Sequence, residues 1–441
     1  MKILAMIMLV LLILAVGFVG YVYKKNAMFL PALFGIGGFP NIKKKDYYQA
    51  DGTFRKAEKD DKMAFFMQHP VFGGYKHMFF NVEDNVLKAI APAKYADFLK
   101  AQGRSDQMEN ALEAFNYLTR LVESGEAQLI SDINSKEMIE QNPYQSHLTG
   151  MFYKGKQGKP LAVVVPGGGF ISNVTDCEGY PVAMKLHKLG YSVLVISYPI
   201  GKQLGETEHE KQGQAAVREL VQVIRYLKEH EQELSVDMDD YAIFGFSAGG
   251  MMTTAYSFAN YEDCCHKVKL PRPKVIFPMY GLDWNVKALE QDKGLAVFSI
   301  AGREDEYGFG NVEKRLPQLK SVLGEDNVSV PSMGEEMHLD SPRCMAHWTG
   351  ALLFAFCCAA PMVLLLINKA RELKGRFMVG LIVFCAILLT MLVLLLTVGK
   401  SAIIENIPMQ AAYVLLFLLN FTNIFPVKKA EKAPAKEAAT V

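Results

Sequence analysis

The stretch Gly245-Phe246-Ser247-Ala248-Gly249 has the pattern G-x-S-x-G, and it decides how the rest of the chain is read. The apolar run over residues 241–244 before it predicts a strand, and residues 248–260 after it predict a helix. At a turn from strand to helix, this pattern is typical of a nucleophile elbow, where bulkier residues beside the serine would collide with neighbouring backbone. We therefore interpret Ser247 as a catalytic nucleophile.

Around this motif, short β-rich runs alternate with longer helical segments. This alternation predicts an α/β fold with a mostly parallel sheet and right-handed crossovers. The predicted strands cover residues 147–153, 161–165, 192–197, 241–244, 275–279, 296–300 and 328–330. The predicted helices cover residues 177–189, 210–229, 248–260 and 312–323.

A glycine-rich loop, Pro166-Gly167-Gly168-Gly169-Phe170, closes the predicted strand 161–165. Glycine lets backbone amides approach a substrate closely. We expect the amide of Gly168 or Gly169, together with that of Ala248, to form an oxyanion hole. Taken alone, the loop would fit a purely structural turn better.

A serine nucleophile needs a histidine base and an acid that orients the base. In this kind of fold the chain order is serine, acid, histidine. Asp305 follows the strand predicted at 296–300 and is our candidate acid, with Glu304 as its competitor. His338 follows the last predicted strand and is our candidate base, because His347 stands too close to a predicted membrane helix.

These motifs together resemble a known family. The PGGGF loop, the segment CEGYPVAMKLHKLGYSV, the elbow GFSAGG and the late Asp/His pair are similar to those of α/β-hydrolases in the carbohydrate-esterase-like branch, related to acetyl-xylan and feruloyl esterases. The resemblance covers about residues 145–348. It implies an eight-stranded α/β-hydrolase core, a triad of Ser247, Asp305 and His338, and hydrolysis of small acyl esters. Pro166 replaces the histidine of many wider relatives, a change that this branch tolerates.

Composition excludes several other classes of protein. The chain has 441 residues, a formal net charge of +1 and 51% hydrophobic residues, so it is not disordered and has no global basic face for nucleic acid. Its seven cysteines lack paired metal-ligand spacing, and Cys264, Cys265 and His266 have no fourth ligand nearby. We expect no metal and no cofactor. Asp176 and Glu178 are interpreted as acids that complement a helix dipole.

Four long apolar runs predict membrane helices, since about 20 apolar residues span a bilayer. They cover residues 3–23, 348–367, 377–398 and 407–427. The expected division is an N-terminal transmembrane anchor (1–25), a helical lead-in or lid (26–145), an α/β-hydrolase domain (146–347), three C-terminal transmembrane helices (348–427) and a disordered tail (428–441).

Basic residues indicate the orientation in the membrane. Lys369, Arg371, Lys374 and Arg376 lie between the second and third runs, and cytoplasmic loops favour such residues. With four spans, this places the hydrolase domain on the extracytoplasmic face. An alternative stays open: the run from residue 348 stands where the last hydrolase helix belongs, and the domain would then face the cytoplasm.

The sequence therefore predicts a membrane-anchored serine esterase that acts on an acylated carbohydrate or another small acyl ester. A peptidase or an acyltransferase of the same fold, and a non-catalytic hydrolase-like binding module, are the alternatives. The expected partners are the substrate and the lipid bilayer, without nucleic acid. The sequence indicates no oligomeric state.

Overall fold

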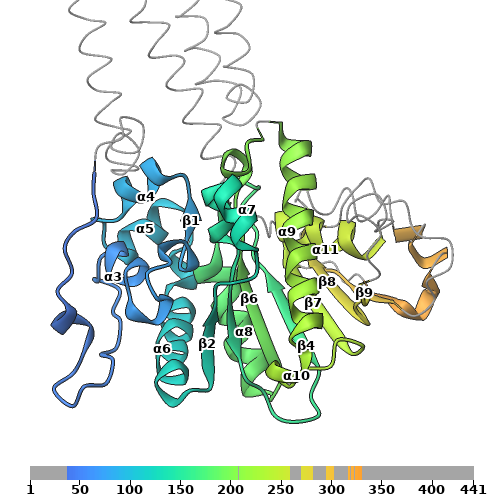
Figure 1. Cartoon of the computed structure of the whole chain (residues 1–441), viewed down its shortest axis with the longest axis horizontal. Coiled ribbons are helices and arrows are strands. Elements are labelled where there is room, and N and C mark those ends of the chain that lie inside the picture. The colour runs from blue at the N-terminus through green and yellow to red at the C-terminus, as the bar shows by residue number, and fades with distance from the viewer. Residues whose placement is uncertain are drawn as a thin grey trace, which may run out of the picture. The chain divides into compact units, whose positions relative to one another are not determined.

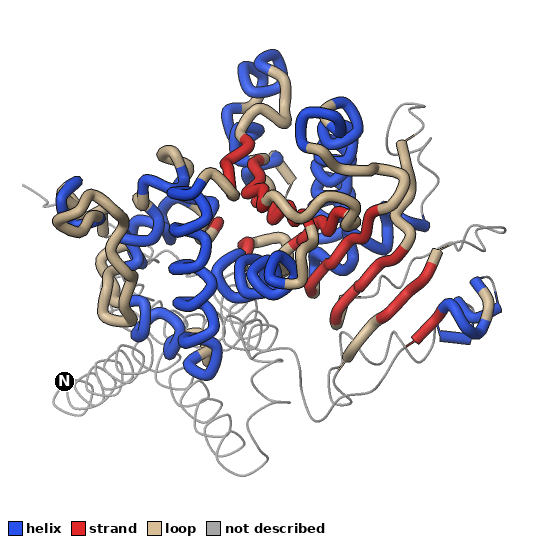
Figure 2. The backbone as a smooth tube through the Cα atoms, turned by 90° about the horizontal axis from the view of Figure 1, so that it is seen from below, coloured by secondary structure: helices blue, strands red, loops and turns tan. Residues whose placement is uncertain are grey.

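The protein has a central sheet with helices on both sides (Figure 1; Figure 2). The computed structural model describes residues 37–206, 208–258, 270–281, 295–301, 316–317, 319–321 and 323–329. Within them the sheet has eight strands, in spatial order β2 (Ala127–Ile130), β3 (Thr149–Tyr153), β6 (Ser192–Ser197), β4 (Leu161–Val165), β7 (Tyr241–Phe246), β8 (Val275–Met279), β9 (Ala296–Phe298) and β10 (Val328–Ser329). The α-helices with described bounds are α3 (Met63–Met67), α4 (Asp84–Ile90), α5 (Tyr95–Ala101), α6 (Met108–Ser124), α7 (Lys136–Gln141), α8 (Tyr180–Lys188), α9 (His209–Glu229), α10 (Glu231–Leu234) and α11 (Ala248–Phe258).

The order and direction of the strands define the fold. Strand β3 runs antiparallel to its neighbours β2 and β6. The other neighbouring pairs of the described sheet are parallel. The chain passes from β4 to β6 on one side and then crosses back to β7 on the other, so β4 and β7 lie side by side at a point where the direction of winding reverses. This arrangement is the α/β-hydrolase fold, as the sequence predicted.

Both faces of the sheet are buried, as strand β4 illustrates. Val163 and Val165 lie in a hydrophobic cluster with residues of α9 and α11. Ala162 and Val164, between and beside them, lie in a second cluster with residues of α6 and α8. Successive side chains of a strand point to opposite faces, so a continuous apolar run such as LAVVV is typical of a strand covered on both sides.

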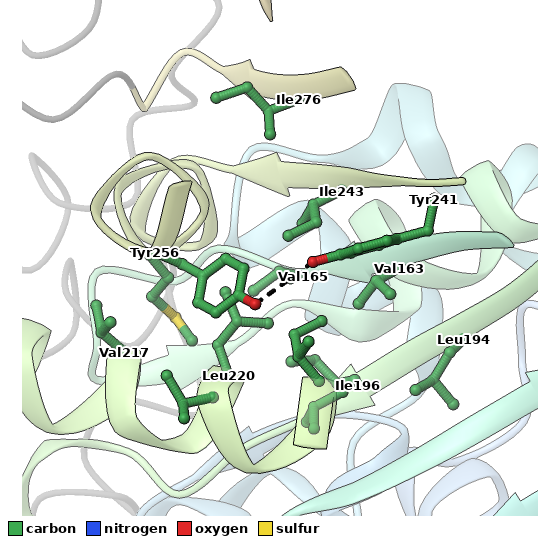
Figure 3. Packing of buried hydrophobic residues seen from close by; sticks show 14 of the residues in the cluster. Val163, Val165, Leu194, Ile196, Val217, Leu220, Tyr241, Ile243, Tyr256 and Ile276 are labelled. Carbon is green, nitrogen blue, oxygen red and sulfur yellow. Dashed lines mark hydrogen bonds between the residues drawn. The ribbon is translucent and has the colours of Figure 1, made fainter. Parts of the chain in front are cut away.

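Figure 3 shows part of the cluster on the α9 and α11 side. Leu220 of α9 is fully buried there, and burial of such a side chain stabilises the fold by about 1.5–3 kcal/mol. The hydroxyl groups of Tyr241 and Tyr256 lie 3.4 Å apart, and each donates a hydrogen bond to the carbonyl oxygen of Pro271. The polar ends of these two buried rings are thus satisfied within the core.

The region before β2 packs on the opposite face through aromatic side chains. The rings of Phe66, Phe79 and Phe115 have centroids 4.8, 5.1 and 5.6 Å apart in their three pairs, and all three are buried. They share a cluster with Val164 and Val195 of the sheet. Phe115 belongs to α6, within the region that the sequence predicted as a helical lead-in or lid. A role of this region as a lid stays a prediction.

A two-stranded sheet attaches this region to the hydrolase core. Strand β1 (Asn81–Val82) pairs antiparallel with β5 (Ser172–Asn173), which follows the glycine loop. The Asn173 side-chain oxygen accepts hydrogen bonds from the amide of Tyr198, at 2.9 Å, and from the hydroxyl of Ser197, at 3.1 Å. The Asn81 side chain donates to the Tyr198 carbonyl oxygen at 2.8 Å. Both asparagines are buried, so the small sheet holds the end of β6.

The predicted strands are all present, and those at 161–165, 192–197 and 275–279 have the predicted bounds. Strand β2 was not predicted, because only its two end residues are buried and Gln128 is exposed, which leaves no apolar run. The helix expected from residue 177 begins at Tyr180, after a π-helical turn over Thr175–Gly179. The helix predicted at 312–323 is described only in part.

The membrane predictions concern other parts of the chain. No helix among the described residues is long and apolar enough to span a bilayer. The four apolar runs predicted to do so, and the tail from residue 428, lie outside the described residues.

Candidate active site

Ser247 lies on a sharp turn between the end of β7 and the start of α11, as the sequence predicted. Its φ angle is +48°, in the left-handed region that non-glycine residues rarely adopt. The turn is held from two sides: the Ser247 amide donates to the Met279 carbonyl oxygen at 2.9 Å, and the Met251 amide donates to the Ser247 carbonyl oxygen at 3.0 Å. Strain of this kind persists only where the surroundings fix it.

The two glycines of the G-x-S-x-G motif are required by close packing. A Cβ atom on Gly245 would lie 2.2 Å from the Thr253 hydroxyl oxygen, and one on Gly249 would lie 2.1 Å from the Val165 carbonyl oxygen. A third glycine, Gly281, was not singled out from the sequence. A Cβ atom on Gly281 would lie 2.0 Å from the Ser247 carbonyl oxygen, and its only sequence signal is its place two residues after a predicted strand.

The glycine loop after β4 lies against this turn. A Cβ atom on Gly167 would be 2.5 Å from the Phe246 carbonyl oxygen and 2.9 Å from the Ser247 Cβ. Gly168, Gly169 and Phe170 then have φ angles of +131°, +62° and +60°. The structure therefore brings the predicted loop and the predicted nucleophile together.

The three amides predicted to form the oxyanion hole make no backbone hydrogen bond among the residues that the structure describes. Gly168 and Gly169 donate no backbone hydrogen bond to any acceptor that the described part of the chain offers. Ala248 is the first residue of α11, where the amide has no partner within the helix. Their role as an oxyanion hole stays a prediction that this geometry permits.

Asp305, its competitor Glu304, and His338 lie outside the described residues, as do His347 and the Cys264-Cys265-His266 group. The strands that lead to the acid and the base are described. The Tyr280 amide donates to the Ile300 carbonyl oxygen at 2.7 Å, which ties the exit of β9 to the segment beside Ser247. Parallel strands end at one edge of a sheet, so β9 and β10 leave it at the edge that carries Ser247.

Sequence reasoning missed the contacts of Glu178. Its carboxylate accepts a hydrogen bond from the Gly167 amide at 2.7 Å through Oε2, and one from the Tyr280 hydroxyl at 3.0 Å through Oε1. The residue was expected only to complement a helix dipole, and it lies in the first turn of the π-helical segment before α8. The π-helical turn directs the Glu178 side chain to the glycine loop. No pattern in the sequence predicted this turn.

A buried charged cluster surrounds Glu178. Arg104, from the segment between α5 and α6, is 6% exposed and Asp176 is 1% exposed. Burial raises the pKa of Asp176 to about 6, although Arg104 and a hydrogen bond from the Tyr95 hydroxyl, at 2.9 Å, favour its ionised form. Burial disfavours the charge on Arg104, yet its neighbours, Glu178 first among them, raise its pKa above the usual value. Burial and the Glu178 charge also raise the pKa of Tyr280, which keeps its hydroxyl protonated as a donor.

The chain is similar to one protein family and to several solved structures. A family model described as BD-FAE matches residues 151–335, which is less than half of the chain. A search of the curated proteins found no match. Similar solved structures include MGS-M1, an α/β hydrolase enzyme from a Medee basin deep-sea metagenome library (21% identity, 49% of this chain and 84% of that chain covered, TM-score 0.36). Others are the esterase Est2 of Thermogutta terrifontis with propionate bound (15% identity, 42% and 78% covered, TM-score 0.35) and the carboxylesterase Cest-2923 of Lactobacillus plantarum WCFS1 (17% identity, 43% and 78% covered, TM-score 0.35).

Proposed function

We propose that the protein is a serine hydrolase that cleaves carboxylic esters through an acyl-enzyme. The observation that carries the proposal is Ser247 at φ +48° on a turn from strand to helix, with the glycine loop packed against it. This arrangement exposes a hydroxyl group beside backbone amides that have no partner within the described fold. The BD-FAE match over residues 151–335 and the resemblance to carbohydrate-esterase-like hydrolases support the same reaction class.

In the proposed mechanism, His338 removes the proton of the Ser247 hydroxyl as the oxygen attacks the ester carbonyl carbon. Asp305 orients His338 and stabilises the imidazolium that forms. The amides of Gly168, Gly169 and Ala248 stabilise the negative oxygen of the tetrahedral intermediate, which collapses by expelling the alcohol with a proton from His338. Water, activated by His338, then releases the acid from Ser247.

Labelling with a fluorophosphonate probe tests the nucleophile. We expect the wild-type protein in membranes to label at neutral pH, and the Ser247→Ala variant not to label. The Asp305→Asn and His338→Gln variants should label much more slowly, because loss of a triad member costs about 10⁴-fold or more in activity. If neither wild type nor variant labels, the protein is a non-catalytic binding module.

We propose an acylated carbohydrate as the substrate, on the basis of the family resemblance. Hydrolysis rates should be compared for an acetylated sugar, a long-chain ester and an aminoacyl amide. Preference for the sugar ester supports the proposal. Preference for the amide indicates a peptidase, and transfer of the acyl group to an added alcohol in place of water indicates an acyltransferase.

We also propose that the apolar runs anchor the protein with its hydrolase domain outside the cytoplasm. The basic loop around Lys374 supports this orientation. A cysteine introduced beside Lys374 should resist a membrane-impermeant thiol reagent added to intact cells and react after lysis. Labelling from outside would reverse the orientation.

A further inference from the structure

The Glu178 carboxylate joins the two backbone segments that flank the nucleophile. Strand β7, which ends one residue before Ser247, lies between β4 and β8 in the sheet. Gly167 follows β4 and Tyr280 follows β8. One oxygen of Glu178 accepts the Gly167 amide at 2.7 Å and the other accepts the Tyr280 hydroxyl at 3.0 Å. A single side chain thus connects both neighbours of the turn that carries Ser247.

The packing around Gly167 leaves no room for a side chain at this position. The position that a Cβ atom on Gly167 would take lies 2.9 Å from Glu178 Oε2 and 2.9 Å from the Ser247 Cβ. On the other side, Tyr280 has a φ angle of +39°, a strained value for an aromatic residue. Gly281 follows it and is in direct contact with the Ser247 backbone. The segment that presents the Tyr280 hydroxyl is therefore packed directly against the turn that carries Ser247.

We propose that Glu178 is a positioning residue of the active site, which fixes the Gly167 amide and thereby aims the amides of Gly168 and Gly169 at the oxyanion. The proposal rests on the function proposed above. Glycine-rich backbone has many accessible conformations, and an oxyanion hole works only when its donors are fixed beforehand. The Gly167 amide is already used by Glu178, which assigns the oxyanion to the two amides that follow it.

A carboxylate so close to the nucleophile needs a countercharge, because it would otherwise oppose the negative charge that develops on the substrate. Arg104 supplies it. This guanidinium is buried, and the charge of Glu178 is among the causes that raise its pKa. Arg104 belongs to the N-terminal region, so that region contributes to the electrostatic balance of the site.

The test compares Glu178→Ala, Glu178→Gln and Tyr280→Phe in the full-length protein. The readouts are kcat and KM on a short-chain ester, and the Ki of a trifluoromethyl ketone, which forms a tetrahedral adduct with the serine. Glu178→Ala should lower kcat by about 10- to 100-fold with little change in KM, because the oxyanion donors are misplaced. The Ki should rise by the same factor by which kcat/KM falls. Glu178→Gln keeps an acceptor for the Gly167 amide and Tyr280→Phe removes only one bond, so both should lose less.

Glu219 of α9 provides a matched control. It is also buried and also accepts two side-chain hydrogen bonds, but these come from Asn134 and Gln145 and not from the glycine loop or Tyr280. Glu219→Gln should lower stability and leave kcat and Ki unchanged. If the Glu178 variants change kcat no more than Glu219→Gln does, the positioning role is wrong while the esterase function stands. A wild-type protein that neither hydrolyses esters nor binds the ketone would overturn both.

Discussion

Gly281 occupies a position where a single added methyl group should disable the site. Its Cβ atom would lie 2.0 Å from the carbonyl oxygen of Ser247, which is backbone and cannot move aside cheaply. We expect Gly281→Ala to lower kcat by at least about 100-fold, since displacements of about 1 Å have such effects. Gly38, with nothing within 4 Å of the same position, is the control, and Gly38→Ala should keep full activity. Equal activity of the two variants would contradict the close packing of Gly281 against Ser247.

Asp176 should couple protonation to folding. Burial raises its pKa to about 6, so the folded protein holds this proton more tightly than the unfolded chain, where the pKa is about 3.9. This contribution to stability is fully present below about pH 4 and is lost as the pH rises through about 6. The Asp176→Asn variant has no carboxyl group at this position, so it does not lose this stability as the pH rises. The free energy of unfolding of the variant, relative to wild type, should therefore increase by roughly 3 kcal/mol between about pH 4 and pH 8.

Urea denaturation at several pH values measures this difference. The exposed Asp106 provides the control, because Asp106→Asn makes the same change of charge in water. A difference between Asp176→Asn and wild type that is constant with pH would show that the carboxyl group titrates normally.

At the scale of single residues, the sequence predicted what depends on local geometry. Ser247 and the glycine loop could be identified from the sequence because a tight turn restricts the residue types at a few neighbouring positions. Asp305 and His338 follow from chain order alone, and they stay predictions. The contacts of Glu178 and Arg104 could not be predicted, because they join segments far apart in sequence through a π-helical turn that has no distinct signal.

Among the elements, the pair β1 and β5 offers the sharpest test. Asn173 accepts hydrogen bonds from the Tyr198 amide and the Ser197 hydroxyl, both buried. Asn173→Ala leaves the buried Tyr198 amide unpaired, which costs about 1–3 kcal/mol, while the Ser197 hydroxyl can still donate to the His77 carbonyl oxygen at 3.2 Å. Thermal unfolding should show the loss, whereas Asn110→Ala, at an exposed position of α6, should change stability little. Comparable stability of the two variants would mean that water replaces Asn173.

The strands of the sheet centre were predictable because they are apolar on both faces. Leu161–Val165 and Ser192–Ser197 are buried throughout, so their hydrophobic runs have the length of the strands. Strand β2, at the edge, buries only its ends, and β1 and β5 have two residues each. Such elements form because tertiary partners hold them, and no local pattern identifies them.

For the molecule as a whole, two cores share one sheet, and we expect them to unfold together. Leu220 lies in the cluster on one face and Phe115 in the cluster on the other. Leu220→Ala should cost about 2–5 kcal/mol and Phe115→Ala about 3–5 kcal/mol. Because the strands contribute side chains to both clusters, each variant should lower the midpoint of one common transition.

Denaturant unfolding of the protein, monitored by circular dichroism and by proteolysis, measures this transition. Leu189→Ala is the control, since that side chain is 65% exposed and its loss should change the midpoint little. Two separate transitions, one sensitive to each variant, would contradict a shared sheet and would make the N-terminal region a foldable unit of its own.

The aromatic packing of the N-terminal region also has a consequence during synthesis on the ribosome. Phe66 and Phe79 are made more than 80 residues before Val164 and more than 110 before Val195, the sheet residues whose cluster they share. At about 5–20 residues per second, several seconds to some tens of seconds pass before that surface exists. During this interval the nascent chain exposes an apolar aromatic segment, to which we expect chaperones to bind. Slowing translation between these segments should therefore increase aggregation of the newly made protein.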